Sequence, residues 1–129
     1  MSNRRLISTG SPFEKAYGYS RAVIDEPFCF VAGTTGYDYK TMTLPEDVAE
    51  QTRNCWRTIE TALKDAGFAL SDLVRAVYYV TDPAYQVPVL EVCGPLLADI
   101  RPAATMLVVA GLLKPEIKVE IEVTAKRRG

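Results

Sequence analysis

The most constraining feature of this sequence is a set of strand-like segments that are apolar on both faces. In Leu73–Val80 and Ala103–Ala110 both alternating sets of side chains are mainly apolar, and Phe28–Ala32 follows the same pattern. Strands of this kind are typical of a sheet whose two faces are both covered. A fold for this chain must therefore bury both faces of a sheet.

Turn signals separate these strands from their neighbours. Two extended runs, Ser20–Ile24 and Pro27–Thr34, are joined by an acidic pair and predict a hairpin. The segment Gly33–Tyr39 follows the second run and predicts a loop, because it combines two glycines with an aspartate and hydroxyl side chains.

A helix is predicted after this loop. It should begin near Pro45, because Thr43 and Glu46 have the spacing of a capping box and proline suits a first turn. Gly67 is placed to end the helix as a left-handed cap. The apolar side of the helix recurs every three or four residues and comprises Val48, Thr52, Cys55, Ile59, Ala62, Leu63 and Ala66.

The C-terminal half adds a second helix and two strands. Ala84–Ile100 is apolar at irregular spacing and is interrupted by Pro88 and Pro95, which predicts a broken or kinked helix. After a strand at Ala103–Ala110, the segment Lys118–Ala125 alternates strictly. This alternation predicts a strand whose core face carries Val119, Ile121, Val123 and Ala125.

Together these elements give the order β-β-α-β-α-β-β and a single α+β domain over residues 1–129, with two helices on one face of a mixed sheet. A chain of 129 residues has room for one core. Two helices cover one face, so the other apolar face must be buried by something outside the monomer. A homo-oligomer packed sheet against sheet meets this requirement.

Composition excludes several classes of function. The chain has no histidine, which removes histidine-based triads and histidine zinc sites. Its formal net charge of -1 gives no long-range attraction for nucleic acid, whose binding needs clustered cations. Three cysteines, Cys29, Cys55 and Cys93, match no disulfide or metal spacing and are expected to be reduced and buried. No apolar run has the length of a membrane span or signal peptide, so a cytoplasmic location without membrane contact is expected. Neither a metal nor a cofactor is expected.

Without histidine, a general base must be a carboxylate, lysine, tyrosine or cysteine. Glu120 and Glu122 project from one face of the last predicted strand, about 6.6 Å apart. In a closed site their repulsion would raise the pKa of at least one of them toward neutrality. The alternative is a terminal strand that presents both glutamates to solvent.

Three other segments carry candidate binding groups, each with a structural alternative. The loop Gly33–Tyr39 offers hydroxyls, phenols and backbone amides to a ligand, or is a plain strand-to-helix turn. Tyr19 lines a pocket, or packs near the hairpin. Arg101 anchors an anionic ligand, or satisfies the carbonyls at a helix end.

The pattern resembles the reactive intermediate deaminase (Rid, or YjgF-type) family over nearly the whole chain. The resemblance rests on the order and spacing of several landmarks. They are Tyr19–Val23, Phe30–Thr34, the helix into Ala66 and Gly67, Asp72–Val74, Arg101–Thr105 and Val119–Ala125. It implies a chorismate-mutase-like subunit with six strands and two helices, assembled as a homotrimer with small-molecule clefts between subunits.

The resemblance also implies roles for the residues that match. Tyr19 matches the tyrosine that lines the cleft, and Glu120 matches the glutamate that orients the attacking water. Gly33 and Thr34 match the loop whose backbone contacts the ligand.

The main departure from the family lies at Ala104, where deaminating members have an arginine that pairs with the substrate carboxylate. Thr105 follows it, and Met106 replaces a cysteine that is common at the next cleft position. Removing one partner of a desolvated ion pair costs about 3–5 kcal/mol. Arg101, three residues upstream, is the candidate substitute for the missing cation.

Three functions follow, in order of preference. The first is a hydrolase or deaminase-like enzyme that acts on an imine, enamine or related electrophile, with 2-imino acid deamination in doubt because of Ala104. The alternative is a non-catalytic trimer that binds a small metabolite. The older family label of ribonuclease or translation inhibitor comes last, because neither the charge balance nor the lack of histidine supports RNA cleavage.

Overall fold

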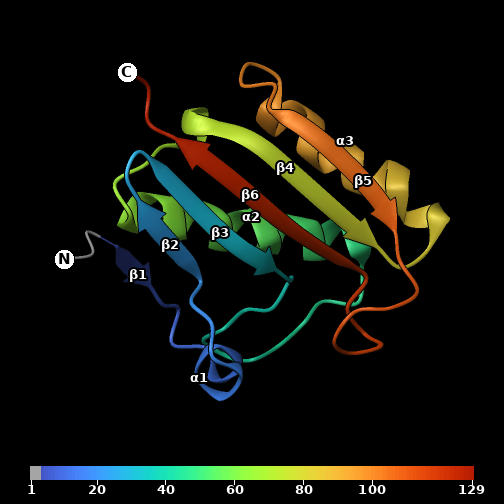
Figure 1. Ribbon diagram of the computed structural model, residues 1–129. Coiled ribbons are helices and arrows are strands. Elements are labelled where there is room, and N and C mark those ends of the chain that lie inside the picture. The colour runs from blue at the N-terminus through green and yellow to red at the C-terminus, as the bar shows by residue number, and fades with distance from the viewer. Residues whose placement is uncertain (1–3) are drawn as a thin grey trace.

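The structure is a computed structural model that describes residues 4–129. Its elements are β1 (Arg5–Ile7), α1 (Pro12–Tyr17), β2 (Ala22–Asp25), β3 (Phe28–Thr34), α2 (Val48–Asp65), β4 (Leu73–Val80), α3 (Gln86–Leu97), β5 (Ala103–Val108) and β6 (Val119–Lys126), with 3-10 turns at Leu70–Asp72 and Pro83–Tyr85. The strands form one sheet in the order β1-β2-β3-β6-β4-β5, and α2 and α3 lie behind it (Figure 1). Neighbouring strands are antiparallel except β4 and β5, which are parallel.

The predicted α+β architecture, a six-stranded mixed sheet with two helices on one face, is confirmed, but the order β-β-α-β-α-β-β is incomplete. It lacks β1, which forms one edge of the sheet, and the short helix α1. β1 has three residues, too few for a readable alternation. α1 does carry signals, because Ser11 accepts a hydrogen bond from the Phe13 N–H and Gly18 ends the helix at φ 72°.

The predicted capping box of α2 is wrong. The N-cap is Asp47, whose side chain accepts a hydrogen bond from the Glu50 N–H at 3.0 Å. Thr43 instead bridges Asp38 within the preceding loop. Aspartate is at least as good an N-cap residue as threonine, and here Asp47 takes that position. The helix therefore begins at Val48 and not near Pro45. The predicted end is confirmed, since Gly67 adopts φ 79° after the last turn.

The segment Ala84–Ile100, predicted as a broken or kinked helix, is a 3-10 turn followed by the 12-residue helix α3. Pro88 lies in the first turn of α3, where its missing N–H would have no partner within the helix. Pro95 is accommodated inside the helix. The first proline therefore belongs to the start of α3 and does not interrupt it.

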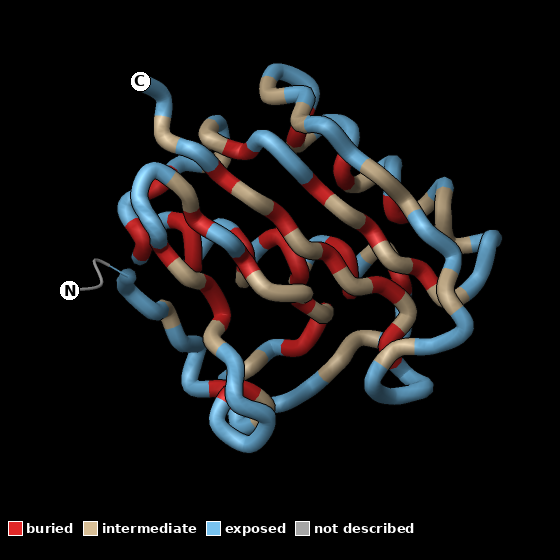
Figure 2. Tube along the Cα trace, in the orientation of Figure 1, coloured by how far each residue is buried: buried red, intermediate tan, exposed pale blue. Residues whose placement is uncertain are grey.

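The core lies between the sheet and the two long helices (Figure 2). On β6 the predicted core face is buried and the alternating residues are half-buried, which confirms the predicted orientation of this strand. The predicted apolar side of α2 is also buried, together with Gln51 and Trp56. The three cysteines are free and buried, as expected.

Among the residues that the structure describes, no helix lies over the opposite face of the sheet (Figure 1). Phe30 on β3 and Leu107 on β5 are 46% and 45% exposed there. Their strand partners place them on the side of the sheet that also carries Glu120. The uncovered apolar face that the two-sided strands predict is therefore present in the monomer. No helix within residues 4–129 is long and apolar enough to cross a membrane.

Candidate functional site

The candidate site is centred on Glu120, near the start of β6. Glu120 pairs with Tyr79 of β4 and projects from the face that the helices leave uncovered. The residue is half-buried. The chain shields one side of this carboxylate, and the open face of the sheet leaves access to it.

A β-bulge in β3 brings the backbone against the Glu120 carboxylate. The register between β3 and β6 shifts between Val31 and Thr34, which leaves one extra residue on β3. Gly33 lies in this bulge, and a Cβ placed there would overlap Glu120 Oε2 and lie 3.0 Å from Glu120 Cδ. A side chain at position 33 would therefore force the Glu120 carboxylate, the end of a flexible side chain, out of its present place.

Burial raises the pKa of the Glu120 carboxyl above its ordinary value. The positive charge of Arg21 lowers this pKa, and the negative charge of Glu122 raises it further. The upward direction expected for a glutamate of this pair is found, but burial, not repulsion by Glu122, is its main cause. A carboxyl with a raised pKa exchanges its proton closer to neutral pH, as a general base requires.

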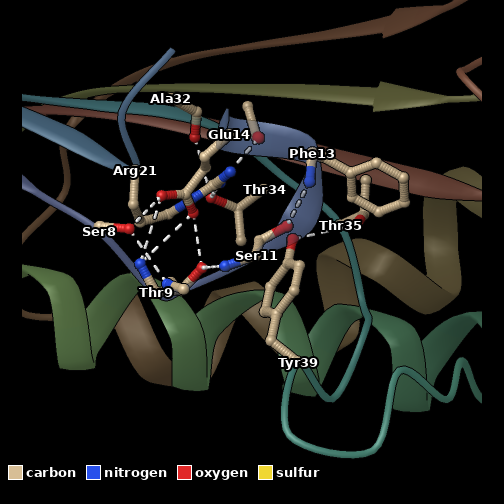
Figure 3. Close-up of polar contacts among 12 residues, drawn as sticks. Ser8, Thr9, Ser11, Phe13, Glu14, Arg21, Ala32, Thr34, Thr35 and Tyr39 are labelled. Atoms are coloured by element: carbon tan, nitrogen blue, oxygen red, sulfur yellow. Dashed lines mark hydrogen bonds and ion pairs between the residues drawn. The ribbon is translucent and has the colours of Figure 1, made fainter. Parts of the chain in front are cut away.

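Arg21 belongs to the site, although its sequence context gives no sign of this role. Its side chain is 1% exposed and donates from Nη1 to the Gly33 carbonyl at 2.9 Å and to Thr34 Oγ1 at 2.7 Å (Figure 3). Its guanidinium carbon lies 5.6 Å from the centre of the Tyr19 ring. The predicted residues Tyr19, Gly33 and Thr34 thus gather with Glu120 around a buried cation.

The neighbouring carboxylate, Glu122, is held differently. It accepts a hydrogen bond from the Tyr79 hydroxyl of β4. This bond is the main cause that raises the pKa of the Tyr79 phenol. Of the two glutamates, Glu122 is therefore tied to β4, whereas Glu120 faces the bulge of β3.

The other predicted site residues lie on or beside β5, the second edge of the sheet. Ala104, Thr105 and Met106 pair with β4, so β4 separates them from β6. Two strand spacings, about 10 Å, lie between Ala104 and the strand that carries Glu120. Arg101, at φ 54°, follows the end of α3. Within one chain these four residues do not meet the Glu120 group.

The loop after β3 contributes Tyr39, whose ring centre lies 5.9 Å from the guanidinium carbon of Arg21. Tyr37 is buried, with its ring centre 5.9 Å from that of Phe13. A cavity of about 500 Å³ is lined by both tyrosines, by Ser8–Thr9 and by α2. Glu120 does not line this cavity, but Tyr39 does, so the cavity lies beside Tyr39 and not at the Glu120 carboxylate.

Gly33→Ala is expected to lower the free energy of unfolding by about 1 kcal/mol, the low end of the cost of overpacking, because the new methyl group must displace the Glu120 carboxylate, which is the end of a flexible side chain. Urea denaturation measures this change. The matched control is Gly94→Ala, since a Cβ there meets nothing within 4 Å inside α3, and this change should stabilise by about 0.5–1 kcal/mol. Equal stability of Gly33→Ala and the native chain would contradict the close contact.

Comparisons with known proteins agree with this fold. Residues 9–127 match the family model described as Endoribonuclease L-PSP. A member of the YjgF/YER057c/UK114 family from Mycobacterium tuberculosis, of known crystal structure, is 44% identical with a TM-score of 0.89, covering 97% of this chain and 100% of that one. The YjgF gene product from E. coli is 28% identical with a TM-score of 0.85, covering 96% and 99%. A RutC family protein from Pyrococcus horikoshii is 31% identical over 108 residues, which are 83% of this chain and 85% of that protein.

The family model covers most of the described chain, and both the sequence relatives and the solved structures point to the same group of proteins. The chorismate-mutase-like subunit that the sequence landmarks imply is confirmed by the shared fold. This chain therefore belongs to the Rid/YjgF family, whose family model carries the description Endoribonuclease L-PSP.

Proposed function

We propose that this protein adds water to an imine, enamine or related electrophile, with Glu120 orienting the attacking water. The observation that carries the proposal is the half-buried Glu120 carboxylate, of raised pKa, held against the Gly33 backbone. Water adds across a C=N bond to give a carbinolamine, which loses ammonia and leaves a carbonyl compound. The oxygen of water stays on carbon, and its two hydrogens leave with the nitrogen.

The proposed assembly is a homotrimer with the reactive cleft between subunits. Two observations support it: one apolar face of the sheet is uncovered, and Ala104, Thr105, Met106 and Arg101 lie on the sheet edge away from Glu120. A head-to-tail ring would bring the β5 edge of one subunit to the Glu120 group of the next. Light scattering should give a species of three times the mass of one chain, and a monomer at micromolar concentration would contradict this assembly.

The proposed substrate lacks a carboxylate at the position where the family's deaminating members bind one, or directs its anion toward Arg101. Ala104 supplies no cation there. Arg21, the buried cation of the Glu120 group, already bonds to Gly33 and Thr34. Its guanidinium is also buried and already faces the Glu14 carboxylate, so it does not present a bidentate clamp to a substrate acid.

The test is ammonia release from freshly generated 2-aminoacrylate or a longer imino acid. Ala104→Arg is expected to raise the rate at least tenfold, because a desolvated carboxylate–arginine pair is worth several kcal/mol. Ala103→Arg is the matched control, since Ala103 is also exposed but projects from the face of the sheet that carries Glu120, whereas Ala104 projects from the helix-covered face at the β5 edge. A native rate that already equals that of an arginine-bearing relative would contradict the retargeted cleft.

A non-catalytic metabolite-binding trimer is the second candidate, and the lack of a cation at Ala104 is the observation that favours it. It predicts no ammonia release from either the native chain or Ala104→Arg. RNA cleavage, which the family description names, gains no support from a chain without histidine and with a net charge of -1.

A further inference from the structure

A buried ion pair lies behind the candidate site. Arg21 and Glu14 are 1% and 4% exposed, with 3.5 Å between Arg21 Nε and Glu14 Oε2. Arg21 Nε has no hydrogen-bond partner among the described residues. A buried guanidinium without good pairing costs several kcal/mol, so a fold that keeps one needs a reason beyond stability.

Glu14 is itself held firmly in place. Its carboxylate accepts hydrogen bonds from Ser8 Oγ at 2.8 Å, Thr9 Oγ1 at 2.5 Å and the Thr9 N–H at 3.3 Å (Figure 3). The helix that carries Glu14, α1, begins at the Ser11 cap. The segment between β1 and β2 therefore fixes the position of the Glu14 carboxylate, and that carboxylate faces Arg21.

Arg21, held by Glu14, in turn holds the backbone at the bulge of β3. Its Nη1 hydrogen bonds go to Gly33 and Thr34, the residues at the bulge that abuts Glu120. The rings of Tyr19 and Tyr39 lie 5.6 Å and 5.9 Å from its guanidinium carbon. These contacts fix the guanidinium and, through it, the peptide that touches the Glu120 carboxylate.

Arg21 also supplies charge to Glu120. The other titratable groups that act with Glu120 are Glu122 on β6, Tyr79 on β4, Tyr19 before β2 and Cys55 on α2. Within the described part of the chain, Arg21 is the cation of this set, and its charge lowers the pKa that burial raises. Without it the site would hold a carboxyl surrounded by neutral or negative groups.

We propose that Arg21, anchored by Glu14, is a positioning residue that fixes the Gly33–Thr34 backbone against Glu120 and provides the counter-charge for its carboxylate. The consequence for catalysis rests on the proposed role of Glu120, whereas the positioning itself does not. Arg21 thus acts through Glu120 and not on the substrate.

The test is a titration of the Glu120 carboxyl by ¹³C NMR. In Arg21→Gln the Glu120 pKa should move upward from its native value, and Arg21→Lys, which keeps the charge, should return it toward that value. Because Arg21→Gln leaves Glu14 buried and unpaired, the double variant Glu14→Leu/Arg21→Met is measured as well, and it should show the same upward shift. Arg127→Gln is the matched control, since Arg127 forms an exposed ion pair with Glu26, and it should leave the titration unchanged.

An unchanged Glu120 titration in the folded double variant would overturn the inference. This readout does not depend on turnover. If the ammonia assay fails but the titration shifts, the proposed function is lost and the positioning role stands. If ammonia is released but the titration does not shift, the positioning role is lost and the proposed function stands.

Discussion

Glu14→Gln is expected to lower the free energy of unfolding by about 3–5 kcal/mol, because it leaves the buried guanidinium of Arg21 without its counter-charge. Glutamine has nearly the same size, but its single carbonyl oxygen can replace only one of the two Glu14 oxygens, Oε1 and Oε2, that accept from Ser8 Oγ and Thr9 Oγ1. The loss therefore reports the missing charge together with one lost acceptor, and not a cavity. Urea denaturation of the native chain and the variant at the same protein concentration measures it, since subunit association contributes to stability.

Two comparisons make this result decisive. The double variant Glu14→Leu/Arg21→Met should lose much less stability than Glu14→Gln alone, because replacing both charges by apolar groups of similar volume removes the uncompensated ion. Glu26→Gln, which breaks the exposed pair with Arg127, should be within the error of the measurement. Equal losses for Glu14→Gln and Glu26→Gln would show that Arg21 does not need its partner.

The elements that the sequence predicts well are those whose signals are local. The strict alternation of β6 identifies both its core face and the side that carries Glu120, and both are found. Gly67 predicts the end of α2 because few other residues adopt φ 79° without strain. The uncovered face follows from the same local patterns, since two helices cannot cover both sides of a sheet.

The parts that the sequence does not predict depend on tertiary pairing. Arg21 reads as an ordinary charge before a strand, and its burial is decided by a carboxylate on α1, seven residues earlier in the chain. Glu120 and Ala104 read as one site through the family resemblance, yet the strand order puts β4 between their strands. The bulge in β3 likewise has no signal beyond Gly33 itself. In each case the missing information is the register or contact of segments that local patterns do not connect.

Glu120→Gln is expected to reduce the proposed turnover by about 10²–10⁴-fold, the usual contribution of a general acid or base, while increasing stability at neutral pH. Burial raises the pKa of Glu120 above its ordinary value of 4.5, so between these two values the native state binds more protons than the unfolded chain. The free energy of unfolding of the native chain must therefore fall as pH rises through this window. Glutamine does not titrate, so the variant lacks this fall.

Denaturation at about pH 4 and about pH 7 tests the effect on stability. The advantage of Glu120→Gln over the native chain should be present at the higher pH and largely absent at the lower one. Glu91→Gln, on the exposed side of α3, is the matched control and should show no such difference. If Glu120→Gln were destabilising at neutral pH, the carboxylate would belong to the structure and not to the chemistry. If Glu120 lowers stability at neutral pH and its replacement removes turnover, then the fold keeps this carboxylate for function. The Gly33 backbone and the Arg21 guanidinium are the groups that hold it in place.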